Sequence, residues 1–146
     1  DYQSNLQMET MLNWADFPLK TYDKLRYADT DRQGHVNNAV FATFLETGRV
    51  EMLYKNDRQL IRDNHSFVIA SLSLDLLAEI RWPGTVEIGS CIQKVGNSSI
   101  TLYQQLFQND KVVAKASSVL VQVNASGRSV ALSEEAKLIL QGYIIR

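Results

Sequence analysis

Four strand-length segments fill the second half of the chain, and they restrict it to folds built on an antiparallel sheet. Each is rich in β-branched and aromatic residues, and they span about Phe67–Trp82, Thr85–Val95, Ser98–Gln108 and Lys111–Val123. Turn-forming pairs separate them, namely Pro83-Gly84, Gly96-Asn97 and Asn109-Asp110. Because such short connections join neighbouring antiparallel strands, we predict hairpins at all three turns.

The segment Phe67–Trp82 is long for a strand, and its inner part, Leu72–Leu77, also has helical propensity. Apolar residues nevertheless hold a strict period of two from Val68 to Ile80. That period is typical of a strand, so we predict a strand here.

One long helix is predicted before these strands. Apolar residues recur there with the spacing of a single helical face, at Phe41, Phe44, Leu45, Gly48 and Met52. The helix should begin near Asn37 or Asn38, either of which can cap free backbone N–H groups, and end around Asn56. A strand over Leu19–Tyr27 precedes it.

A short C-terminal helix is predicted after Ser133, because a serine cap is followed there by acidic residues. The element order favours an α+β fold with one long helix on a curved antiparallel sheet. At 146 residues the chain fits one domain, residues 1–146, with residues 1–18 as an N-terminal extension. The exposed sheet edges favour pairing with a second copy.

Charge and cysteine content exclude several classes of protein. The net charge of −1 gives no reason to expect nucleic-acid binding. The one cysteine, Cys91, has no metal-ligand spacing with His35 or His65, so we expect no metal site. No apolar run approaches the roughly 20 residues of a membrane span. We therefore expect a cytoplasmic protein that does not bind membranes.

The polar cluster from Asp29 to Asn38 is the strongest candidate for a site. It places two carboxylates, an imidazole and two amides at the end of a predicted strand, just before the start of the helix. Free N–H groups at a helix start can stabilise the oxyanion that forms when a carbonyl is attacked. A carboxylate beside them can attack that carbonyl or activate a water molecule.

Three motifs in this region resemble the 4-hydroxybenzoyl-CoA thioesterase-like family of the hot-dog superfamily. They are RYADTD at 26–31, GHVNNAV at 34–40 and FLE at 44–46. The GHVNN segment is also similar to plant acyl-ACP thioesterases. The resemblance implies a hot-dog fold, with a central helix wrapped by a curved sheet of about five strands. It also implies a homodimer or homotetramer with active sites at the subunit interface.

The resemblance further implies hydrolysis of an acyl-CoA or acyl-carrier-protein thioester without a cofactor. Asp31 matches the carboxylate that serves the family as nucleophile or general base. Asn38 matches the position whose backbone N–H faces the thioester carbonyl. His35 would orient the substrate or contact Asp31. Taken alone, Asp31 could equally organise a turn or cap the helix.

The remaining candidates concern substrate binding and local structure. Gly34 permits close backbone approach, while Asn37 and Phe41 would line the acyl site. Arg128 is a candidate for the CoA phosphates, as are Arg81 and Lys115 on charge alone. Asp29 is expected to shape the loop, and Glu46 to be structural and able to pair with Arg49 three residues on.

Two other functions fit the same sequence. A hot-dog dehydratase or hydratase would need a different arrangement of acid and histidine, which we do not find. A non-catalytic acyl-CoA-binding module remains open, although the chain has neither a basic excess nor an added DNA-binding segment.

Overall fold

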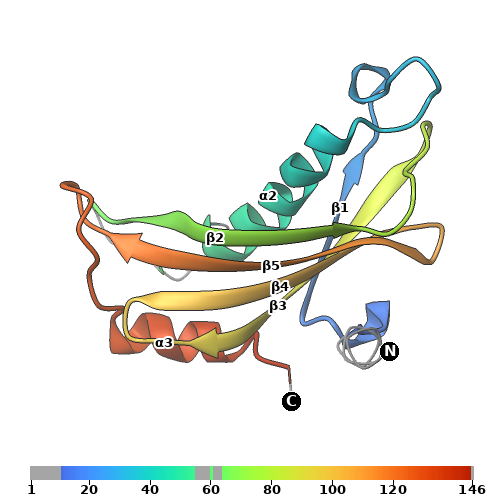
Figure 1. Cartoon of the computed structure of the whole chain (residues 1–146). Helices are drawn as coiled ribbons and strands as arrows, with labels where there is room; N and C mark the ends of the chain where they lie inside the picture. The colour runs from blue at the N-terminus through green and yellow to red at the C-terminus, as the bar shows by residue number, and fades with distance from the viewer. Residues whose placement is uncertain (1–10, 55–59, 61–63, 146) are drawn as a thin grey trace, which may run out of the picture.

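A curved antiparallel sheet carries one long helix across one of its faces (Figure 1). The structure, a computed structural model, describes residues 11–54, 60 and 64–145. Its strands are β1 (Leu19–Lys24), β2 (Ser66–Leu76), β3 (Thr85–Val95), β4 (Ser99–Gln108) and β5 (Lys111–Val123). The helices are α2 (Asn38–Tyr54) and α3 (Glu134–Gln141), with short 3-10 turns η1 (Trp14–Asp16) and η2 (Tyr27–Asp29). The predicted α+β class and the five-stranded sheet are confirmed.

The strands lie in the order β1-β3-β4-β5-β2, and each pairs antiparallel with its neighbours. The predicted hairpins β3–β4 and β4–β5 are confirmed. The predicted hairpin at Pro83-Gly84 is wrong, because β2 pairs with β5 at one edge of the sheet while β3 lies between β1 and β4. The connection from β2 to β3 therefore crosses the sheet instead of turning back on itself.

The predicted strand Phe67–Trp82 is also too long, since β2 ends at Leu76. Beyond it, the N–H groups of Leu77 and Ala78 both donate to Val113 O, at 2.9 and 3.1 Å. Ile80 then accepts a hydrogen bond from Val36 N at 2.7 Å and is fully buried. The period of two continued past the strand because Ile80 enters the core from a loop.

The ends of the other elements agree closely with the sequence. α2 begins at Asn38 as predicted, and its predicted end near Asn56 lies outside the described residues. β1 ends at Lys24 instead of Tyr27, because the chain turns into η2. The α3 cap is confirmed, since Ser133 Oγ accepts from Ala136 N at 3.0 Å.

The predicted apolar face of α2 packs against the sheet, and all five of its residues are buried. Gly48 allows the helix to approach closely: a Cβ there would lie 2.5 Å from Gln104 Nε2 and 2.7 Å from Ser90 Oγ. Gln104 Nε2 itself donates to Leu45 O and to Ser90 Oγ, both at 3.0 Å. A small buried polar cluster thus fixes the helix on the sheet.

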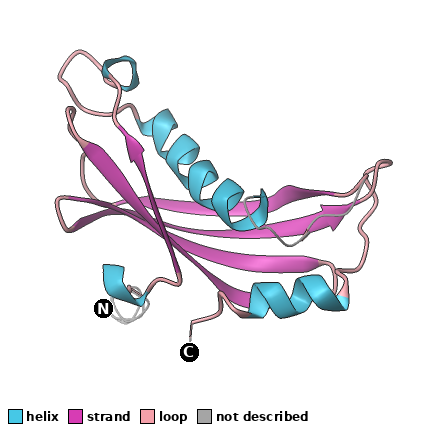
Figure 2. Cartoon of the chain, turned by 180° about the vertical axis from the view of Figure 1, so that it is seen from behind, coloured by secondary structure: helices cyan, strands magenta, loops and turns pink. Residues whose placement is uncertain are grey.

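The opposite face of the sheet is covered at two places, by the N-terminal segment and by α3 (Figure 2). Phe17 is buried there against Gly89, and Leu12 exchanges two backbone hydrogen bonds with the Gln105 side chain, at 2.8 and 2.9 Å. Part of the predicted N-terminal extension therefore packs on the sheet. In the described part of the chain, no helix has both the length and the apolar character needed to cross a bilayer.

Candidate active site

A cavity of about 520 Å³ lies beside the first turn of α2. Its walls come from the loop before α2, from the start of α2 and from the end of β2 with the residues that follow it. The lining residues are Asp31, His35, Val36, Asn37, Asn38, Phe41, Leu76, Leu77, Ala78 and Glu79. Five residues predicted from the sequence, Asp31, His35, Asn37, Asn38 and Phe41, therefore meet at one cavity.

Asp31 uses one carboxylate oxygen to shape the loop. Its Oδ1 accepts from Gln33 N at 2.8 Å and from His35 N at 3.2 Å. Within the described part of the chain, no donor contacts Oδ2. The turn-forming role considered from the sequence is thus real, and it leaves the second oxygen of an exposed side chain available at the cavity.

The backbone donors at the start of α2 are partly satisfied by Asn37. Asn37 caps the helix, because its Oδ1 accepts from Ala39 N at 3.0 Å and its carbonyl accepts from Val40 N at 2.9 Å. Asn37 N itself donates to Asp29 O at 2.9 Å. Among the residues that the structure describes, none accepts from Asn38 N. A free N–H at the positive end of a helix therefore lies in the first turn beside the cavity.

The His35 imidazole points to a carboxylate that the sequence did not predict. Its Nε2 lies 3.3 Å from Glu79 Oε2, and the same oxygen is 3.3 Å from Arg81 Nη2. Within the described part of the chain, His35 contacts Asp31 through its backbone alone: His35 N donates to Asp31 Oδ1 at 3.2 Å, and His35 O accepts from Asp31 N at 2.8 Å. Glu79 was missed because it fell within the overlong predicted strand. Its signal was a charge pair, Glu79 and Arg81, in an otherwise apolar stretch.

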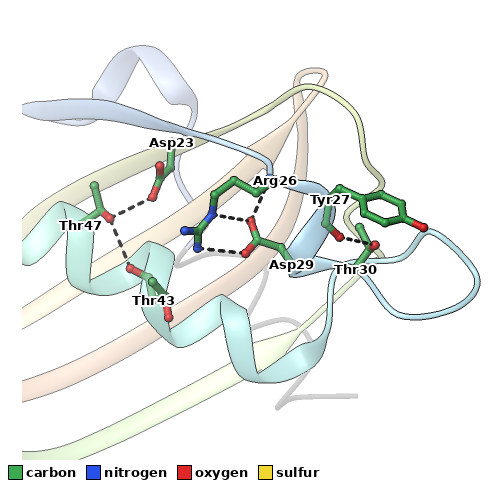
Figure 3. A network of polar contacts seen from close by, with 7 residues as sticks. All are labelled: Asp23, Arg26, Tyr27, Asp29, Thr30, Thr43 and Thr47. Carbon is green, nitrogen blue, oxygen red and sulfur yellow. Dashed lines mark hydrogen bonds and ion pairs between the residues drawn. The ribbon is translucent and has the colours of Figure 1, made fainter.

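Asp29 has the structural role predicted for it (Figure 3). It is buried, its Oδ1 lies 3.1 Å from Arg26 Nη2, and its Oδ2 accepts from Arg26 N at 3.0 Å. On the neighbouring strand and helix, Thr47 Oγ1 donates to Asp23 Oδ2 at 3.1 Å, which links α2 to β1. These contacts hold the loop and the helix start in place beneath the cavity.

The predicted substrate-binding residues are not all at the cavity. Gly34 has a φ of +79°, as a turn glycine requires, and its carbonyl accepts from Trp82 N at 3.3 Å. Arg128 follows the turn after β5 and does not line the cavity of its own chain. Lys115 lies beside Asp75 in a separate pocket, with Nζ 4.0 Å from Asp75 Oδ2.

The Glu46–Arg49 pair considered from the sequence does not form an ion pair within the described part of the chain. Arg49 is buried at the side of α2, and burial lowers the pKa of its guanidinium while the nearby Glu46 charge opposes that shift. Glu46 is exposed.

This arrangement joins an available carboxylate oxygen, a free helix N–H and apolar walls. An acyl carbonyl between the first two would be polarised by the N–H and exposed to the carboxylate. In the part of the chain that the structure describes, no three histidine, cysteine or acidic side chains gather in a way that could hold a metal ion.

Residues 25–140 match the family model of the thioesterase-like superfamily. The chain belongs to this superfamily. The match includes the loop, α2 and all strands but β1, so every residue that lines the cavity lies inside it. The resemblance drawn from the three motifs is confirmed.

Curated relatives are similar over most of their length. The acyl-CoA thioester hydrolase YbgC of Escherichia coli O6:H1 is 26% identical over 115 residues, covering 77% of this chain and 81% of that protein. The acyl-CoA thioesterase YbgC of Haemophilus influenzae is 25% identical over 130 residues, covering 86% of this chain and 93% of that protein.

Solved structures show the same fold. The PA5185 protein of Pseudomonas aeruginosa matches with a TM-score of 0.80 and 25% identity, over 90% of this chain and 94% of that one. A Thermus thermophilus thioesterase, complexed with coenzyme A and Zn, matches with a TM-score of 0.76 and 28% identity, over 88% and 95%.

Proposed function

We propose that this protein hydrolyses acyl-CoA thioesters, with Asp31 as its catalytic carboxylate. One observation carries the assignment: the carboxylate of Asp31 and the free N–H of Asn38 belong to residues that line the same cavity. Membership of the thioesterase-like superfamily and the similarity to acyl-CoA thioester hydrolases support the reaction.

The thioester carbonyl oxygen would accept a hydrogen bond from Asn38 N, which stabilises the negative charge that forms on attack. Asp31 Oδ2 would either attack the carbonyl carbon or remove a proton from an attacking water molecule. Collapse of the tetrahedral intermediate breaks the C–S bond and releases the CoA thiolate. After direct attack, water then hydrolyses the acyl-enzyme anhydride to the free acid.

The other residues of the cavity position the loop and the acyl group. Phe41, Leu76 and Leu77 offer an apolar wall for the acyl chain. His35 bridges the loop to Glu79 and so holds Asp31 against the end of β2.

We further propose that the protein works as a homodimer joined through β2. This strand pairs only with β5 among the described strands, so its outer backbone groups are left at the sheet edge. Five large apolar residues on and just after it are exposed, and we call them the β2 patch: Val68, Ile69, Leu72, Leu76 and Leu77. A long apolar edge of this kind favours pairing with an identical strand.

This dimer would complete the substrate site. Antiparallel pairing of two β2 strands brings the Ser66 end of one beside the Leu76 end of the other. Ser66 pairs with Val123, and Arg128 follows shortly after Val123 in the chain. A second subunit would therefore bring its Arg128 towards the cavity, where CoA phosphates need a cation.

The function is tested by free-thiol release from short, long and aromatic acyl-CoAs. Asp31→Asn should lower kcat/KM by about a hundredfold or more, because the amide can still accept at Oδ1 but cannot act as base or nucleophile. Asp110→Asn, in the β4–β5 turn, is the matched control and should retain full activity.

Equal activity of wild type and Asp31→Asn would remove Asp31 from the reaction. Binding of acyl-CoA by the wild type without any thiol release would instead favour the non-catalytic binding module.

A further inference from the structure

The buried side chain of Arg49 has a guanidinium nitrogen without an acceptor among the described residues. The residue retains only 9% of its accessible surface, and its Nη1 makes no hydrogen bond. In the part of the chain that the structure describes, Arg49 Nη1 is the one buried side-chain polar atom without a hydrogen-bond partner. A buried guanidinium without an acceptor is strongly destabilising, so an acceptor is expected in the working protein.

A cavity beside Arg49 has room for such an acceptor. A cavity of about 190 Å³ lies between the second half of α2 and the strands β2 and β5, lined by Glu46, Arg49, Val50, Leu53, Tyr54, Phe67, Ile69 and Leu120. Val50 and Tyr54 are exposed on α2, and Ile69 belongs to the β2 patch. The cavity thus borders the surface through which we propose that two copies associate.

Glu46 has the complementary charge in the same cavity. It is exposed, and in the described part of the chain no cation lies within ion-pair distance of it. Because a two-fold interface brings one surface onto itself, positions on two facing α2 helices are exchanged across the axis. An axis between positions 46 and 49 would bring each Glu46 to the other subunit's Arg49.

We propose that Arg49 pairs with Glu46 of the partner subunit, twice in each dimer. The inference rests on the proposed β2 dimer and gives it a specific polar contact. The pair satisfies the buried guanidinium with a carboxylate, the acceptor that matches it in charge and geometry. It also fixes how far one β2 strand slides along the other, which an apolar edge alone specifies weakly.

Two charge reversals test the pairing. Glu46→Arg and Arg49→Glu should each weaken homodimerisation at least tenfold in sedimentation experiments, because each places like charges together. Mixed in equal amounts, the two variants should form heterodimers at least tenfold in excess over either homodimer by native mass spectrometry. Only pairing between subunits predicts this preference, since an ion pair within one chain would be absent from both variants.

The matched control is the ion pair in α3 between the exposed Glu134 and the half-buried Lys137, which has the same spacing and an Oε1–Nζ distance of 3.6 Å. Glu134→Arg and Lys137→Glu should leave dimerisation unchanged. A mixture of the Glu46 and Arg49 variants that shows no heterodimer preference would overturn the proposal, as would unchanged homodimers or a monomeric wild type.

If circular dichroism shows that a reversed variant does not fold, Glu46→Gln and Arg49→Gln take its place. A double-mutant cycle on the dimer dissociation constant should then give a coupling of fivefold or more, whereas additive effects would refute the pair. Thiol release by the wild type is measured separately, so failure of this pairing is distinguished from failure of the proposed thioesterase activity.

Discussion

The two edge strands of the sheet, β1 and β2, solve the problem of an open edge differently. β1 has six residues, three of them charged, and its side chains alternate between half-buried and exposed. β2 has eleven residues with one charge, Asp75, and nine of its positions are exposed. Short, charged edges discourage further strands from pairing, whereas long apolar edges invite them.

The contacts of α2 also differ between the two edges of the sheet. The helix makes its main sheet contacts with β1, β3 and β4, and Thr47 links it to β1 through Asp23. The β2 edge has no comparable cover. The comparison indicates that the β1 edge is protected within the subunit, while the β2 edge is left open to the second copy that we propose.

Of the changes that test this difference between the two edges, a charge placed in the β2 patch should have the largest effect. Leu72→Lys places an ammonium where we expect two apolar edges to meet, and should raise the dimer dissociation constant at least about thirtyfold, the effect of losing about 2 kcal/mol. Sedimentation measures the change, and thiol release should fall with it. Tyr22→Lys on β1 is the control, and dissociation by both variants alike would contradict the distinction between the edges.

Gly48→Ala tests how firmly α2 is packed against the strands that it contacts, β1, β3 and β4. The added methyl group would meet Gln104, Ser90 and Ile88 at less than 3.0 Å. We expect a loss of about 1–3 kcal/mol in the free energy of unfolding, measured by urea denaturation. An unchanged stability would show that the helix can move away from the sheet at little cost.

Thr47→Val should have the smallest effect. It removes the hydrogen bond to Asp23 while keeping the side-chain shape, and should cost about 1 kcal/mol in thermal or urea unfolding. Thr43→Val on the exposed side of α2 is the matched control, because only the backbone carbonyl of Thr43 takes part in the contact with Thr47. Equal effects of the two variants would mean that the link to β1 contributes nothing.

The sequence predicted best what depends on neighbouring residues. The cap at Asn37, the buried face of α2 and the two true hairpins all follow from local spacing and turn residues. The meeting of Asp31 with Asn38 could also be predicted, because a short loop joins them.

Contacts between distant segments were harder to predict. Strand order depends on which edges meet in three dimensions, so β2 was placed beside β3 instead of β5. Glu79 reached the site for the same reason, through a crossing connection that periodicity could not reveal. Nothing in the sequence indicates that Arg49 would be buried without an acceptor within the described part of its own chain.

The two backbone hydrogen bonds to Asp31 Oδ1 have an entropic consequence. A free aspartate rotates about two side-chain bonds, and a reaction that needs one orientation must first restrict both. Here the loop has already restricted them during folding. If Asp31 is the catalytic carboxylate as we propose, the rate advantage of a correctly oriented group is supplied before the substrate arrives. In the proposed mechanism, loop residues that never touch the acyl group would therefore contribute to the reaction rate through the torsions of Asp31.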